Sequence, residues 1–132
     1  MNTLLAPQAR RSPLHRYRDM DLSSRIEGAS PHALVSTLYD ELIAALDVLK
    51  RAMERGDAEL RMTQHERATT ILHALDAGLD RVDGGDLAKS LAKIYRQMQR
   101  RLIAARTGDI TAVSDVREGV GNLAAAWSAI AR

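Results

Sequence analysis

Four histidines are the side chains in this sequence best suited to metal binding or phosphoryl transfer: His15, His32, His65 and His73. Helical proteins can hold metal ions with Glu-x-x-His motifs, which place both side chains on one face of a helix. Met62 stands three places before His65 and Thr70 stands three places before His73, so this motif is absent. The sequence also has no cysteine, which excludes thiolate ligands and disulfides. We therefore expect no bound metal.

Phosphoryl transfer is the other chemistry to consider, through the segment HALDAG at 73–78. Histidine phosphotransfer bundles carry the pattern H-x-x-K-G, in which the lysine steadies the phosphoryl oxygens. Here Asp76 replaces that lysine and the glycine comes one place late, and a carboxylate at this position would repel phosphate. The sequence shows no nucleophile paired with a base and no glycine-rich phosphate loop. We expect no catalytic residue and no cofactor.

Two rows of charge recur at helical spacing. A basic row, called the basic ridge below, has the spacing i, i+4, i+7 and i+11 and contains no acid: Lys89, Lys93, Arg96 and Arg100. An acidic row has heptad spacing: Asp40, Asp47 and Glu54. Two interpretations stay open for these rows. In the first, both rows are solvated faces that keep a helical protein in solution. In the second, the basic ridge attracts an acidic partner segment.

Composition limits the class of protein. The chain has 132 residues, a net charge of +2, 3% aromatic residues and no phenylalanine. Its core must therefore consist mainly of Leu, Ala, Val, Ile and Met, which suits helices better than sheets. The small charge excess argues against a nucleic-acid partner, and no apolar run approaches the roughly 20 residues of a membrane span. We expect one soluble, all-α, cytoplasmic domain without membrane insertion.

Apolar residues at intervals of three and four predict four helices, over about 31–55, 58–81, 87–106 and from 110 onward. Ser30 is a suitable N-cap for the first helix, and Pro31 suits its first position. Gly-Asp then recurs at 56–57, 85–86 and 108–109, where glycine can end a helix and aspartate can cap the next. Short links require neighbouring helices to run antiparallel. Residues 29–132 should form an antiparallel up-down-up-down four-helix bundle.

Residues 1–28 differ from the rest, because arginines and prolines alternate there without a sustained helical period. We interpret them as a flexible N-terminal arm that stays extended or forms a short helix from about Leu14 to Arg25. Acidic residues interrupt the basic ones, which again argues against a nucleic-acid partner.

The first helix carries two neighbouring files of apolar residues. One file is Leu34, Leu38, Leu42, Leu46, Leu49 and Met53, and the second is Val35, Tyr39 and Ile43. A bundle helix needs an apolar stripe of about 100° to meet its neighbours, and two files exceed that width. The helix should therefore offer apolar surface to a partner.

The last predicted helix, from residue 110 onward, contains Gly119 and Gly121. These glycines either permit close helix approach or weaken that helix.

Several short motifs occur in the order found in one family, the flagellin export chaperones FliS. They are ASP at 29–31, LYD at 38–40, DGGDLA at 83–88, IY at 94–95, RRLIAA at 100–105, GD at 108–109 and Trp127. The sequence resembles that family over about residues 26–128. The resemblance implies a cytosolic chaperone without catalysis or cofactor. Such a chaperone holds the C-terminal segment of flagellin and helps to deliver it to the cytoplasmic domain of the flagellar export gate.

The resemblance also indicates where a partner would bind. An amphipathic flagellin segment would pack on apolar side chains of the bundle, for which we select Val35, Tyr39, Ile43, Tyr95 and Met98. The alternative for these five side chains is the bundle core. In the family the N-terminal segment can cover the groove when no client is present, which here suggests Tyr17, Met20, Leu22 and Ile26.

One departure from the family concerns the arm, because Asp21 stands where the family often has tyrosine, and Tyr17 lies four residues earlier.

The alternative function is a helical adaptor bundle that binds another amphipathic partner segment.

Overall fold

The structure of the protein is a computed structural model, which describes residues 30–79 and 84–130. Those residues form four helices: α3 at Pro31–Arg55, α4 at Ala58–Ala77, α5 at Gly85–Ala105 and α6 at Ile110–Ala129. The chain divides into two units, Met1–Leu34 and Val35–Arg132, and the described part of the first is only 30–34. The predicted arm, with Tyr17, Met20, Leu22 and Ile26, lies outside the described residues.

Three helices begin at the caps that the sequence predicts. The backbone N–H of Ala33 donates to Ser30 Oγ at 3.1 Å. Asp57 Oδ1 accepts from the N–H of Leu60 at 3.1 Å. Asp109 Oδ1 accepts likewise from the N–H of Ala112 at 3.2 Å. Each cap satisfies one of the N–H groups that a helix start leaves without an intrahelical partner.

The first helix ends at Arg55 as predicted, with Gly56 at a positive φ of 72°, but two other predicted ends were displaced. Helix α4 ends at Ala77 rather than near Arg81, because Gly78 follows and a glycine inside a helix costs about 1 kcal/mol relative to alanine. Helix α5 begins at Gly85 rather than Leu87, with Gly84 as its N-cap. The prediction of Asp86 as a cap was therefore wrong. Asp86 lies in the first turn, where its carboxylate still interacts favourably with the positive end of the helix dipole.

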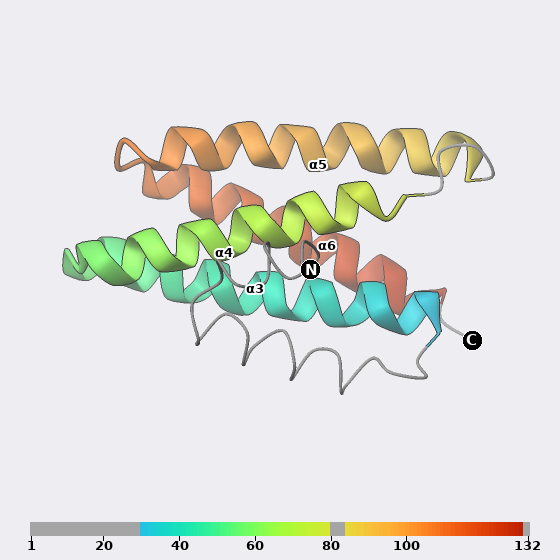
Figure 1. Ribbon diagram of the computed structural model, residues 1–132, viewed down its shortest axis with the longest axis horizontal. Helices are drawn as coiled ribbons and strands as arrows, with labels where there is room; N and C mark the ends of the chain where they lie inside the picture. Colours follow the sequence, from blue (N-terminus) through green and yellow to red (C-terminus); the bar gives the residue numbers. More distant parts are fainter. Residues whose placement is uncertain (1–29, 80–83, 131–132) are drawn as a thin grey trace, which may run out of the picture. The chain divides into compact units, whose positions relative to one another are not determined.

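Within the unit Val35–Arg132, successive helices run in opposite directions (Figure 1). Side-chain bonds join each helix to the next around the bundle. These are Arg67 to Glu41 at 2.7 Å, His65 to the carbonyl of Leu102 at 2.6 Å, Arg101 to Asp115 at 2.5 Å, and Arg117 to Asp47 at 3.0 Å. The all-α, antiparallel up-down-up-down four-helix bundle is confirmed.

The core is mostly aliphatic, as the composition predicts, with two additional tyrosines. Its largest fully buried side chains are Tyr39, Tyr95, Leu42, Leu46, Leu49, Leu72, Leu102, Val113, Val116 and Val120. Each buried leucine or valine contributes roughly 1.5–3 kcal/mol through removal of apolar surface from water. Within residues 30–79 and 84–130, no charged side chain is buried. No helix in that part of the chain is long and apolar enough to cross a membrane.

Helix α6 passes close to α5 at Gly119. A Cβ atom placed on Gly119 would lie 2.9 Å from Met98 Cε, which is closer than real Cβ atoms approach other heavy atoms. The contact shows that the side chain of Met98 packs over Gly119, which is a packing role for this glycine between α5 and α6.

Candidate partner-binding surface

Three aromatic side chains from three helices meet inside the bundle. The phenol oxygens of Tyr39 on α3 and Tyr95 on α5 lie 2.7 Å apart, so one hydroxyl donates to the other. The ring of Trp127 on α6 meets the ring of Tyr39 edge to face, with centroids 6.3 Å apart and planes at 89°. This is a favourable geometry for aromatic pairs. The contacts join α3 to both α5 and α6.

Burial changes the acidity of both phenols. Tyr39 and Tyr95 are each only 1% exposed. Removal from water disfavours the phenolate and raises the pKa of both groups, and for Tyr95 the hydrogen bond with Tyr39 raises the pKa further. The pair is therefore neutral at physiological pH and acts as a structural hydrogen bond.

The structure separates the five side chains that the sequence selects for partner binding. Tyr39, Tyr95 and Met98 are buried in the core, so a partner would reach them only if the bundle opened. Val35 and Ile43 are half-buried and pack against that core. As partner-binding residues, all five remain a prediction.

Tyr39 lies on the face of α3 that packs into the core. Tyr39 shares a face with Leu42 and Leu46, at i, i+3 and i+7, and these two leucines are 0% exposed. Four-residue steps advance about 40° around a helix, so the file runs from the direction of the core stripe at Val35 to its edge at Ile43. Only the ends of this file keep exposed surface.

Two apolar residues of α6 that the sequence does not mark as partner-binding border this site. Leu123 and Trp127 lie one turn apart, are half-buried and pack against the core. Val35 and Ile43 lie one turn on either side of Tyr39, which contacts Trp127. We call these four half-buried residues, Val35, Ile43, Leu123 and Trp127, the α3–α6 strip. In the sequence, Trp127 belongs to the apolar period of the last helix and to the family resemblance, and neither signal marks it as a partner-binding residue.

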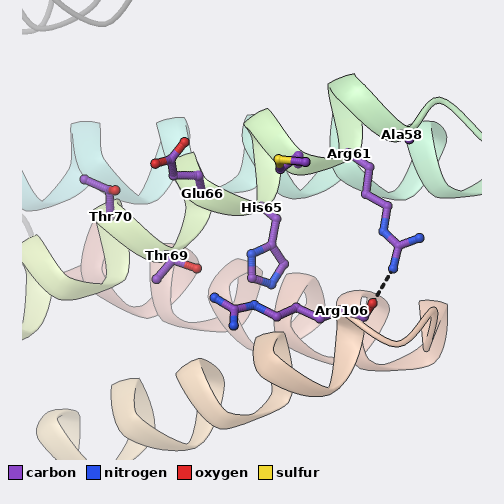
Figure 2. A pocket seen from close by; sticks show the side chains of 8 residues that line it. Ala58, Arg61, His65, Glu66, Thr69, Thr70 and Arg106 are labelled. Carbon is purple, nitrogen blue, oxygen red and sulfur yellow. Dashed lines mark hydrogen bonds between the residues drawn. The ribbon is translucent and has the colours of Figure 1, made fainter. Parts of the chain in front are cut away.

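A second surface feature lies on α4, beside the end of α5. An open hollow of about 620 Å³ is lined by Ala58, Arg61, Met62, His65, Glu66, Thr69, Thr70 and Arg106. Arg61 Nη2 donates to the carbonyl oxygens of Arg106 at 2.7 Å and Ala105 at 3.2 Å. The carbonyl of Ala105 also accepts from the backbone N–H of Gly108 at 3.0 Å, so Arg61 adds to the bonds that hold the end of α5. Figure 2 shows the Arg106 side chain extending beneath His65 toward Thr69.

The histidine considered for phosphoryl transfer is exposed on α4. Gln99 Nε2 lies 3.4 Å from His73 Nδ1, which makes this at most a weak hydrogen bond. In the part of the chain that the structure describes, no group of three or more His, Cys, Asp or Glu side chains could hold a metal ion.

Comparison with known proteins identifies the family. The profile of the family described as Flagellar protein FliS matches residues 13–132. The chain belongs to the FliS family. The match confirms the resemblance seen in the sequence and extends it toward the N-terminus, where it includes Tyr17, Met20 and Leu22.

Individual FliS proteins are similar over most of their length. The Flagellar secretion chaperone FliS of Salmonella typhimurium is 33% identical over 121 residues, covering 90% of this chain and 90% of the relative. The protein of the same name from Vibrio cholerae is 31% identical, covering 91% of this chain and 89% of the relative. Flagellar secretion chaperone FliSB of Pseudomonas aeruginosa is 28% identical and covers 77% of this chain. Membership of this family places the chain among the flagellar secretion chaperones.

Proposed function

We propose that this chain holds the C-terminal helical segment of flagellin in the cytoplasm, prevents its premature polymerisation, and aids its delivery to the cytoplasmic domain of the export gate. The observation that carries the proposal is the FliS match over residues 13–132. Its action is binding, without catalysis or a cofactor.

The α3–α6 strip supports a binding mode for such a segment. A disordered chain that folds as an amphipathic helix places apolar anchors at i, i+3, i+4 and i+7, and these need an apolar surface between two helices. Val35 and Ile43 on α3 and Leu123 and Trp127 on α6 are half-buried, so they can contact a client without unfolding of the bundle. Tyr39, Tyr95 and Met98 support this strip from the core and would contact the client only where helices separate.

The arm completes the proposal. Tyr17, Met20, Leu22 and Ile26 would cover the same strip in the absence of flagellin and leave when the client binds. Their inclusion in the FliS match supports a role in the family's common function.

Titration with a peptide of the flagellin C-terminal segment tests the proposal. We expect one peptide per chain with micromolar or tighter affinity, about −8 kcal/mol or better. Ile43→Asp places a charge in the strip and should weaken binding by about tenfold or more, or about 1.4 kcal/mol. The matched control is Ala44→Asp, because Ala44 is the next residue of α3 and is exposed.

Circular dichroism must show that both variants keep their helicity. Val35→Ser serves as a milder second variant in case Ile43→Asp unfolds the bundle. Absence of binding by the unmodified chain would overturn the proposed function. Equal weakening by Ile43→Asp and Ala44→Asp would instead remove the α3–α6 strip from it.

A further inference from the structure

We propose that the face shared by α4 and α5 is a second docking surface, which takes an acidic amphipathic helix of another protein. This inference goes beyond the proposed function, because it concerns a different pair of helices and a partner of different chemistry. Its parts are the basic ridge of α5, the hollow on α4 and the exposed apolar side chains beside them.

The cations of the basic ridge are not neutralised by ion pairs within the described residues. Its four side chains, Lys89, Lys93, Arg96 and Arg100, are all exposed. Eleven residues of α-helix separate the first from the last, a length of about 16 Å. Among the described residues none of the four forms an ion pair, whereas Arg67, Arg101 and Arg117 each bind a carboxylate on a neighbouring helix. Uncompensated cations at this spacing attract an acidic segment and increase its rate of association.

The direction of the ridge follows from contacts on either side of it. On α5, Gln99 reaches His73 of α4, and Arg101 reaches Asp115 of α6. The ridge residues lie between these two directions around the helix, so they point away from the core. A partner helix can therefore lie along the whole row.

Apolar anchors lie at the C-terminal end of the same face. Ile103 follows Arg100 by three residues, continues the line of the ridge and is 58% exposed. Met62 lines the hollow on α4 and is 71% exposed. Methionine adapts to irregular partner side chains. The guanidinium of Arg106 lies in the same hollow, where it can meet a carboxylate (Figure 2).

These features favour a protein helix over a nucleic acid. A helix with acidic residues at i, i+4, i+7 and i+11 spaces its carboxylates as the ridge spaces its cations. Such a helix can also place an apolar residue beside Met62. A nucleic-acid strand would gain most from exposed aromatic rings for base stacking. Within the described residues of α4 and α5, the one Phe, Tyr or Trp side chain is Tyr95, which is buried.

A designed peptide tests this surface without flagellin. The probe is a fluorescein-labelled helical peptide of about 18 residues with Glu at i, i+4, i+7 and i+11 and Leu on the adjoining face. The control peptide has Gln in place of each Glu. By fluorescence anisotropy, we expect the full chain to bind the Glu peptide about tenfold more tightly than the Gln peptide at about 50 mM salt. The difference should largely disappear at about 500 mM salt.

Charge-reversed variants locate the site. Arg96→Glu with Arg100→Glu should weaken binding of the Glu peptide by about tenfold or more. The matched control is Arg51→Glu with Arg55→Glu on α3, because these residues are also exposed and four apart and give the same change in net charge. This control should stay within about threefold of the unmodified chain. Met62→Ser should also weaken binding, while Ala44→Asp on the exposed face of α3 should leave it unchanged.

Three outcomes would overturn the inference. The first is no binding of the Glu peptide by the unmodified chain, and the second is equal loss in both charge-reversed pairs. The third is binding of an oligothymidylate of about the same length, or of vesicles of phosphatidylglycerol, as tightly as the peptide, which would indicate a general polyanion surface. Because flagellin takes no part in these measurements, failure here leaves the proposed function intact, and the reverse also holds.

Discussion

Two phenol groups bond to each other in the middle of a core that is otherwise aliphatic. Tyr39 and Tyr95 satisfy each other at 2.7 Å, so neither hydroxyl is left without a partner away from water. A buried pair of this kind depends on both members, because loss of one strands the other.

Removal of one hydroxyl should therefore lower the free energy of unfolding by more than the loss of the hydrogen bond alone. We expect Tyr39→Phe to lower the free energy of unfolding by about 1–3 kcal/mol, because the Tyr95 hydroxyl stays buried without a partner. Adding Tyr95→Phe should cost little more, or should recover part of the loss. Urea unfolding of the four members of this double-mutant cycle, followed by far-ultraviolet circular dichroism, measures the coupling. Strictly additive losses would show that the two hydroxyls act independently.

The same pair should make the fold sensitive to alkali. Below the ordinary tyrosine pKa of 10.0, both phenols are protonated in the folded and unfolded chain, so they contribute no pH dependence. Above that pH the unfolded chain releases these protons, while burial raises the pKa of both groups in the folded chain. The unfolded state then binds fewer protons, and stability falls by up to about 1.4 kcal/mol per pH unit for each tyrosine.

Urea unfolding at about pH 9, 10 and 11 tests this dependence. Stability should be flat up to about pH 10 and should fall above it, and Tyr39→Phe should reduce the slope of that fall. If the variant kept the full slope, groups other than Tyr39 would cause the alkaline loss.

At the scale of helices, the bundle is joined by ion pairs of very different exposure. The side chains of Arg67 and Glu41, between α4 and α3, are 12% and 15% exposed. Those of Arg101 and Asp115, between α5 and α6, are 42% and 55% exposed. Within the described residues, Arg67 Nε is buried without a hydrogen-bond partner, so this guanidinium depends strongly on Glu41.

These exposures predict unequal costs for similar substitutions. Glu41→Gln should lower the free energy of unfolding by about 2–4 kcal/mol, because it leaves the Arg67 charge, only 12% exposed, without its carboxylate partner. Asp115→Asn should cost about 0–1 kcal/mol, because water already screens that pair. Urea unfolding of both variants gives the comparison. Similar costs for the two would mean that Arg67 finds another partner.

At the scale of the whole molecule, local rules were enough to predict the architecture. Ser30, Asp57 and Asp109 act as caps because each depends only on the next three residues. Short links then determine that neighbouring helices run antiparallel. The end at Ala77 escaped prediction because Leu79 continues the apolar period beyond Gly78, and periodicity outweighed the helix-breaking signal of one glycine.

The partner-binding surface could not be predicted as well. The width of the apolar stripe on α3 is visible in the sequence, but its direction depends on the positions of the other three helices. Tyr39 points inward because Tyr95 and Trp127 meet it, and both are far away in the sequence. The role of Leu123 beside Trp127 requires the same tertiary knowledge.

The contact between Gly119 and Met98 links two positions that no local rule connects. The methionine methyl occupies the space that a Cβ on residue 119 would need, at 2.9 Å. A single added methyl can be accommodated if this flexible tip swings aside, whereas a β-branched residue at 119 requires a shorter side chain at 98. Substitutions at the two positions should therefore be correlated across homologous sequences, so that the fit of one helix against the next is inherited as a pair.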